Sequence, residues 1–192
     1  MFTIMGISGS PRRNGNTEIL VKGALEPFTA EGHSVHTFFL SERKVSPCRA
    51  CEKCAQEGIC AVKDDLQWLL EKMNICDALI IGSPVYMRNI TAQLKAVFDR
   101  FHCVFQRQPF KGKVGGAIAV GGSPANAQGT VLNIIYSFFL SFGMYCVPSV
   151  VNGVSVVATE KGEVRGQTKS LQEVRVLGEN ILTLLKSLKR GE

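Results

Sequence analysis

Apolar residues along the chain form short runs that alternate with segments in which they recur at helical intervals. Five of these runs have the length and composition of buried strands, at residues 2–7, 34–40, 78–82, 114–120 and 145–151. Helical spacing begins at Asn16 after the first run and recurs at residues 64–70, 91–105, 130–142 and 168–188. This alternation predicts a parallel sheet covered on both faces, because parallel neighbours need crossover connections. Residues 152–166 show neither pattern, and we expect a loop or hairpin there.

The predicted fold class is α/β, with a flavodoxin-like, doubly wound sheet of five parallel strands in the order 2-1-3-4-5. We expect a single domain over residues 1–192, because a chain of this size with 45% hydrophobic residues can bury one core. A cysteine-rich insertion at residues 44–63 interrupts the alternation after the second strand. In such sheets ligands bind beyond the carboxyl ends of the strands, where the strand order reverses. Glycine- or proline-marked turns follow the first, third and fourth strands and are predicted at that edge.

The turn after the first strand is rich in glycine and hydroxyl groups, with the sequence Gly6-Ile7-Ser8-Gly9-Ser10-Pro11-Arg12-Arg13-Asn14-Gly15-Asn16-Thr17. It lacks the Gly-Lys-Thr/Ser ending of a nucleoside-triphosphate loop and the third glycine of a dinucleotide fingerprint, which disfavours ATP and NAD. A terminal monophosphate fits better, because the first amides of the next helix and the charge of Arg12 or Arg13 can bind an anion. The hydroxyls of Ser8, Ser10 and Thr17 can donate to the same group. The alternative is a glycine-rich turn with capping serines.

Four cysteines lie close together, as Cys48-x2-Cys51-x2-Cys54-x5-Cys60. A zinc site usually pairs two hooks separated by a long stretch, whereas here one hook runs directly into the next. Bacterial ferredoxins share the Cys-x2-Cys-x2-Cys start, but this chain has no second set of cysteines for a second cluster. The turn at residues 56–59 lets Cys60 reach the same centre, which fits one [4Fe–4S] cluster. Zinc and free thiols remain as alternatives.

Composition and charge indicate where the protein is located and what kind of partner it binds. Seven cysteines without a secretory signal predict reduced thiols or metal ligands in a cytoplasmic protein. Cys76, Cys103 and Cys146 lie in apolar segments and are assigned only to packing. The net charge of +6 accompanies no nucleic-acid motif, so we expect it to attract anionic cofactors or an acidic electron-transfer partner. The longest apolar runs are too short to cross a bilayer, and no membrane association is predicted.

Four motifs in the first two thirds of the chain form a specific combination. They are the turn at residues 6–17, Gly58-Ile59-Cys60 with Lys63-Asp64-Asp65, Gly82-Ser83-Pro84-Val85-Tyr86, and Leu94-Lys95-Ala96-Val97-Phe98-Asp99-Arg100. Together they resemble the iron–sulfur flavoproteins of the NADPH-dependent FMN reductase family. The resemblance implies FMN, a single [4Fe–4S] cluster on the four cysteines, and a homodimer or homotetramer in which the cluster of one chain approaches the flavin of another.

The resemblance also implies which residues hold FMN. The phosphate is expected at Ser8, Ser10, Arg12 or Arg13, Asn14, Asn16 and Thr17. The isoalloxazine ring is expected at Pro84, Val85, Tyr86, Met87 and the Gly121-Gly122-Ser123 turn. Asp99 and Arg100 are interpreted as a local ion pair with a structural role. Hydride transfer to flavin N5 needs no protein acid or base, so no catalytic side chain is predicted.

Three functional hypotheses follow. The first is an oxidoreductase that passes electrons between FMN and the cluster and exchanges them with a carrier such as ferredoxin. The second is an NAD(P)H-dependent reductase of FMN or quinones whose cysteines hold zinc or nothing. The third is a flavin-free binding module in which the cysteine segment docks a partner.

Overall fold

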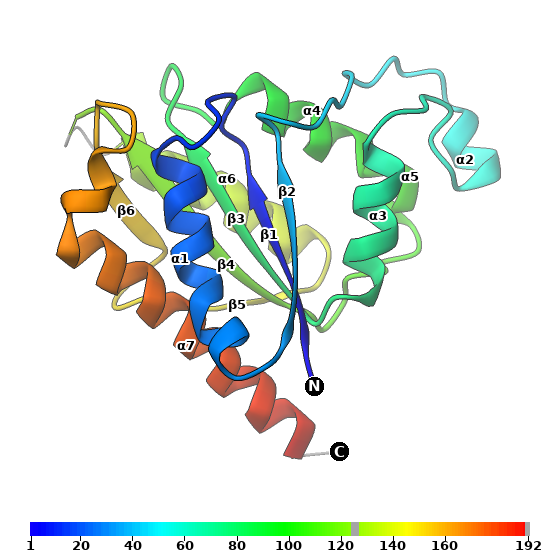
Figure 1. Ribbon diagram of the computed structural model, residues 1–192. Helices are drawn as coiled ribbons and strands as arrows, with labels where there is room; N and C mark the ends of the chain where they lie inside the picture. Colours follow the sequence, from blue (N-terminus) through cyan, green and yellow to red (C-terminus); the bar gives the residue numbers. More distant parts are fainter. Residues whose placement is uncertain (124–126, 191–192) are drawn as a thin grey trace.

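The computed structural model describes residues 1–123 and 127–190 and shows a parallel sheet between two layers of helices (Figure 1). The strands are β1 (Thr3–Ser8), β2 (Ser34–Phe39), β3 (Ala78–Pro84), β4 (Val114–Gly121), β5 (Tyr145–Cys146) and β6 (Val154–Val157). The helices are α1 (Asn16–Ala30), α2 (Lys53–Glu57), α3 (Leu66–Ile75), α4 (Ala92–Arg100), α5 (His102–Phe105), α6 (Ala127–Ser141) and α7 (Thr168–Arg190), with a 3₁₀ turn, η1 (Glu163–Gly166). The predicted strand order is confirmed as β2-β1-β3-β4-β5, and β6 also pairs with β4.

Each central strand contributes to two cores, one on either face of the sheet. Along β1, Ile4 packs in the core beneath α1 and α7, whereas Met5 and Ile7 pack in the core beneath α3, α4 and α6. Because both faces are buried, these strands have continuous apolar sequences instead of alternating ones. The helix pair α1 and α7 packs closely at Gly178, where a Cβ atom would lie 2.3 Å from the carbonyl oxygen of Ala24.

The fifth strand differs from its prediction. Tyr145–Cys146 pairs with the start of β4 and Val154–Val157 pairs with its end, so two short strands occupy the position expected for residues 145–151. Pro148 has no backbone N–H to donate to the sheet, and Val150 and Val151 are 73% and 90% exposed. The prediction of a strand through residue 151 was therefore wrong, and so was the loop or hairpin at residues 152–166, which holds β6 and η1.

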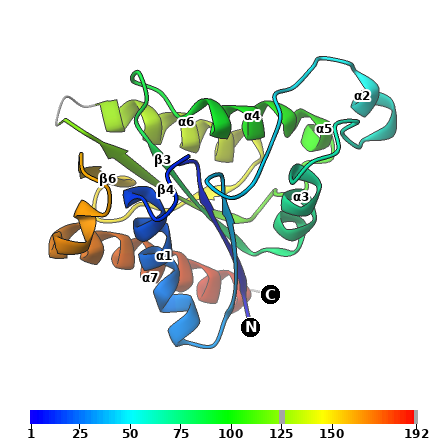
Figure 2. The same cartoon turned by 45° about the horizontal axis from the view of Figure 1, so that its top comes forward.

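The cysteine-bearing segment lies between β2 and α3, as predicted. It leaves the carboxyl end of β2, passes along the edge of the sheet and reaches α2, which packs beside α5 at one end of the molecule (Figure 2). The turns after β1, β3 and β4 lie at the same edge, whereas both termini lie at the opposite one (Figure 1). Among the described helices, none combines the length and apolar character needed to cross a membrane.

Candidate functional site

The turn between β1 and α1 presents a concentration of hydrogen-bond donors. Ser8 and Ser10 are buried, and their hydroxyl oxygens accept from the backbone N–H groups of Ser10 (3.3 Å) and Arg12 (3.1 Å). Each hydroxyl therefore still has its own proton to donate. The residue before the helix, Gly15, provides no side-chain cap, so the first amides of α1 are left for another acceptor. This arrangement suits an anion at the helix N-terminus.

Two buried side chains that were not predicted hold this turn in place. The carboxylate of Glu18, in the first turn of α1, accepts from the backbone N–H of Asn14 (2.7 Å) and from the Ser41 hydroxyl. Thr91 donates to the carbonyl oxygen of Gly9 (2.6 Å) and caps α4 by accepting from the N–H of Leu94 (3.1 Å). The turn is therefore fixed by groups within the protein before any ligand binds.

The two arginines predicted as candidates for phosphate binding lie in different places, and only Arg12 lines the cavity. Arg12 lines a cavity of about 210 Å³, together with Ser10, Asn16 and Thr17. Arg13 is 72% exposed and its Nε atom lies 2.9 Å from the Glu42 carboxylate. Ser8 and Asn14 support the turn from outside the cavity wall.

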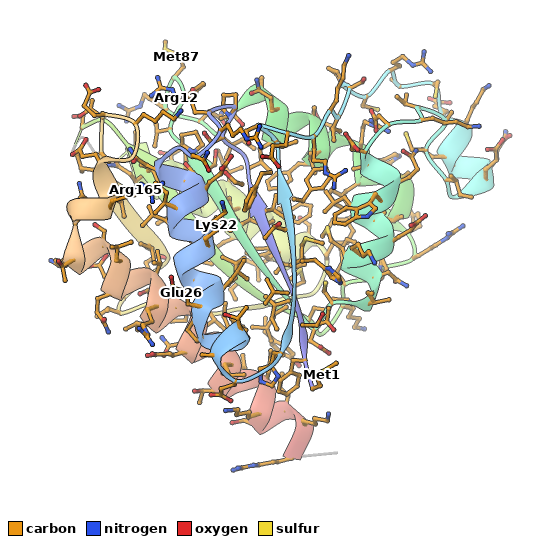
Figure 3. All side chains as sticks on the ribbon, viewed as in Figure 1. Met1, Arg12, Lys22, Glu26, Met87 and Arg165 are labelled. Atoms are coloured by element: carbon orange, nitrogen blue, oxygen red, sulfur yellow. The ribbon has the colours of Figure 1, made fainter. Side chains whose placement is uncertain are left out.

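The turns after β3 and β4 form the other side of the same cavity. Pro84, Val85 and Tyr86 line it together with Val120 and Gly122. Tyr86 and Asn89 exchange backbone hydrogen bonds, which closes a tight turn with Met87 and Arg88 in the left-handed region. Met87, at the tip of this turn, is 96% exposed, and both it and Arg12 lie at the upper edge of the molecule (Figure 3).

Gly121 and Ser123 lie behind the cavity and form part of its support. A Cβ atom at Gly121 would lie 2.8 Å from the side-chain amide of Gln128, and that amide donates to the carbonyl oxygen of Ser123 (2.9 Å). Gln128 is buried in the first turn of α6. Close packing against Gln128 therefore fixes the path of the chain after β4.

The third wall of the cavity was missed by the sequence analysis. Ala158, Thr159 and Lys161 line it from the segment after β6. The Asn16 side chain ties this segment to the phosphate turn, because its amide donates to the Glu160 carbonyl (2.8 Å) and its oxygen accepts from the N–H of Val164 (3.4 Å). The local sequence carried no clear signal for this wall, because it follows the four-residue strand β6, whose parallel pairing with β4 brings its carboxyl end to the edge where ligands bind.

Glu163 orders the same segment. Its carboxylate accepts from the backbone N–H groups of Glu160 (2.9 Å) and Thr159 (2.7 Å), and these hydrogen bonds lower the pKa of Glu163 below its usual value. Because the charged form is the one stabilised, this contribution is present above the ordinary pKa of a glutamate and is lost as the pH falls through the lowered value.

The four clustered cysteines surround a second cavity, of about 450 Å³. Its wall also contains Asp99, Arg100, His102 and Cys103, and none of the seven cysteines, all of which the structure describes, is joined in a disulfide. Among the described residues, no three cysteine, histidine or acidic side chains converge as ligands of one metal ion. Four thiolates around one cavity are a donor set suited to a soft metal centre.

Arg100 connects this cysteine segment to the body of the protein. The predicted ion pair with Asp99 was wrong, because Asp99 pairs with Lys95 one helical turn away, while the buried Arg100 lies 2.5 Å from Asp64. Helical geometry explains the difference, since adjacent residues point in different directions and residues four apart face one another. Burial alone would raise the pKa of Asp64, but hydrogen bonds from Arg100 and from the amides of Ser46 and Leu66 lower it.

The chain is similar to known proteins over most of its length. Residues 2–158 match the family model for NADPH-dependent FMN reductase. The chain is 36% identical to an iron–sulfur flavoprotein of Methanocaldococcus jannaschii over 97% of this chain and 99% of that protein. It is 39% identical to the iron–sulfur flavoprotein of Methanosarcina thermophila over 87% of this chain and 89% of that protein.

The fold has close counterparts among solved structures. A flavodoxin, WrbA-like protein from Agrobacterium tumefaciens superposes with a TM-score of 0.70 at 14% identity, over 97% of this chain and 99% of that one. Such low identity bears on the fold alone, whereas the family model and the sequence relatives cover most of the chain. The protein therefore belongs to the NADPH-dependent FMN reductase family and is an FMN-dependent oxidoreductase.

Proposed function

We propose that this protein transfers electrons between FMN, held in the cavity at the carboxyl edge of the sheet, and a single [4Fe–4S] cluster held by Cys48, Cys51, Cys54 and Cys60. The observation that carries the proposal is that the four thiols of residues 48–60 wall one cavity, in a chain whose sheet edge holds a second cavity beside the turn proposed to bind phosphate. When bound, FMN would accept electrons in pairs and the cluster would exchange them singly.

For the phosphate of FMN, we propose the buried turn after β1. Ser10, Thr17 and the first amides of α1 would donate hydrogen bonds, and Arg12 and Lys161 would add positive charge from two segments of the cavity wall. Ser8 and Asn14 would act through the shape of the turn, because their hydrogen bonds are made within it. Arg13 has no part in this proposal, since it pairs with Glu42.

For the isoalloxazine ring, we propose the apolar surface of Pro84, Val85 and Tyr86, with Gly122 allowing close approach on the far side. A flat ring needs apolar contact on its face and a few backbone donors at its polar edge. The turn that contains Met87 would form the rim of the ring site, and the turn at Gly121–Ser123 would support that site from behind.

For the cluster, the donor set is four thiols, and one buried cation, Arg100, lies beside them. Arg100 donates to the sulfur of Cys60 (3.3 Å), and the backbone N–H of Ala50 donates to the sulfur of Cys48 (3.5 Å). Hydrogen bonds and positive charge of this kind favour the thiolate form that binds iron.

We propose a small electron carrier such as ferredoxin, or NAD(P)H, as the partner, and a cytoplasmic location. Tyr86 and Met87 are exposed at the mouth of the FMN-type cavity, which supports a homodimer or homotetramer that covers this mouth. The second candidate function is an NAD(P)H-dependent reductase of FMN or quinones without a cluster, and the family match to NADPH-dependent FMN reductases favours it. Membership of this family removes the third hypothesis, a flavin-free binding module.

The test is one anaerobic preparation in which FMN, iron, acid-labile sulfide and zinc are measured on the same sample. We expect about one FMN, four irons and four sulfides per chain. Stoichiometric zinc without sulfide, or FMN with no metal at all, would support the second candidate instead. Cys146→Ser is the matched control, because Cys146 lies outside the cysteine cavity and should leave the metal content unchanged.

A further inference from the structure

Arg100 brings a permanent positive charge into the wall of the cysteine cavity. Its side chain has no exposure to solvent, although it comes from the last turn of α4 and faces the segment that carries the four cysteines. One terminal nitrogen donates to Asp64 (2.5 Å) and to the carbonyl oxygen of Ser46 (3.1 Å). The other donates to the sulfur of Cys60 (3.3 Å) and to the carbonyl oxygen of Val62 (2.8 Å).

The fifth donor of this guanidinium is left over. The Nε–H group of Arg100 is buried and has no hydrogen-bond partner among residues 1–123 and 127–190. A buried donor without an acceptor is costly, and the guanidinium lines the same cavity as the four thiols. An acceptor held in that cavity would complete its hydrogen bonding.

The other charged or titratable side chains around the cavity are placed differently. Arg49, Glu52, Asp99 and His102 line it but are exposed, so water and salt screen their charges. Cys103 also lines it and is buried, but a thiol carries no charge. Arg100 is buried, and its charge does not titrate, because an arginine stays protonated. Its field acts on a group in the cavity at much lower effective dielectric.

We infer that Arg100 sets the reduction potential of the group bound by the four cysteines, with Asp64 limiting the effect. This inference rests on the proposed cluster. Reduction adds one electron and therefore one negative charge, which a neighbouring cation stabilises. A hydrogen bond to a thiolate ligand acts in the same direction. The Asp64 carboxylate, paired with Arg100, cancels part of the positive charge.

The test compares two substitutions that should act in opposite directions. In the holoprotein, Arg100→Met removes the cation and should make the midpoint potential of the cluster more negative, lowering the equilibrium constant for one-electron reduction about tenfold, which is about 59 mV. Asp64→Asn removes the counter-charge, leaves Arg100 in place and should make the potential more positive. A purely structural role for the ion pair predicts that both substitutions shift the potential in the same direction, since both break it.

The matched control is Arg107→Met. Arg107 is also an arginine beside this segment and donates weakly to the carbonyl oxygen of Glu57 (3.4 Å), but it is exposed and does not line the cavity. The midpoint potential of this variant, followed by electron paramagnetic resonance during an anaerobic titration, should match that of the unaltered protein.

Three measurements on each sample separate the outcomes. FMN content reports folding of the sheet, iron and sulfide report the cluster, and the midpoint potential reports the role of Arg100. Shifts in the same direction for Arg100→Met and Asp64→Asn, or no shift beyond that of Arg107→Met, would overturn the inference while leaving the cluster in place. If Arg100→Met loses FMN and does not fold, the sign of the Asp64→Asn shift decides. Unaltered protein without iron or sulfide would overturn the cluster, and with it the inference.

Discussion

The FMN-type cavity and the cysteine cavity differ in how much of their structure exists without a ligand. The first is built from the ends of strands and helices, with buried Ser8, Glu18 and Thr91 holding the turn by hydrogen bonds inside the protein. The second is walled by a segment whose only helix is five residues long and has no buried residue. The FMN-type cavity is therefore shaped by the fold itself. The shape of the cysteine cavity depends on the contacts of Arg100 and on the group that the cysteines bind.

The strongest way to test this difference is to remove one thiol. Cys51→Ser changes an exposed residue, so folding of the sheet should be unaffected, but a four-thiolate centre should lose nearly all of its iron. FMN content should stay at the level of the unaltered protein. Iron and FMN assays on the same anaerobic sample check both parts, with Cys146→Ser as the control. Retention of iron by Cys51→Ser would show that this thiol is not a ligand.

Removal of the metal should destabilise the cysteine segment and leave the turn after β1 unchanged. Chelation should speed amide hydrogen exchange at residues 48–60 by about tenfold or more, equivalent to about 1.4 kcal/mol, because metal binding supplies folding free energy to a short, exposed segment. Exchange in the turn at residues 9–15 should not change, since its hydrogen bonds are made within the protein. Equal acceleration in both segments would contradict the contrast between the two sites.

On the flavin side, the largest single effect is expected from Ser10→Ala. Loss of a hydroxyl donor to a phosphate costs about 1.5–3 kcal/mol, so the dissociation constant for FMN should rise about 10- to 150-fold. Titration of the apoprotein with FMN, followed by flavin fluorescence, measures the change. Ser141→Ala is the control, because that exposed hydroxyl donates to a helix carbonyl far from the cavity. An unchanged dissociation constant for Ser10→Ala would remove the phosphate assignment.

A smaller effect is expected from Lys161→Ala. Lys161 lines the cavity but is exposed, so its loss should weaken FMN binding severalfold, by about 0.5–1 kcal/mol, and the difference should shrink as salt is added. Arg13→Ala removes a charge of the same sign that is directed at Glu42 and should leave the affinity unchanged. A larger loss for Arg13→Ala than for Lys161→Ala would reverse the assignment of the basic groups.

The sequence was sufficient for the parts of the fold that depend on continuous apolar runs. β1, β3 and β4 are buried on both faces, so their sequences identify them without reference to the rest of the chain. Their alternation with helices predicted a parallel sheet, and the choice of the flavodoxin-like strand order within that class was confirmed. The fifth strand failed because Val150 and Val151 are apolar but exposed, and composition alone does not distinguish an exposed valine from a buried one. β6, with four residues, was too short to detect.

The candidate site divides in the same way. Ser10, Arg12 and Thr17 follow a strand directly, and local sequence was enough to bring them to one cavity. Lys161 reaches that cavity through the undetected strand β6, and Arg100 reaches the cysteines by pairing with Asp64, 36 positions earlier in the chain. Both depend on contacts between distant segments, which local patterns do not encode.

The central claim is that one chain holds two redox groups in two separate cavities, and an anaerobic crystal structure of protein purified with FMN tests it most directly. We predict the FMN phosphate within hydrogen-bonding distance of Ser10 and the first amides of α1, and iron anomalous scattering from a cluster bound by Cys48, Cys51, Cys54 and Cys60. A different molecule in the first cavity, or a single zinc ion or disulfides among these cysteines, would contradict the claim.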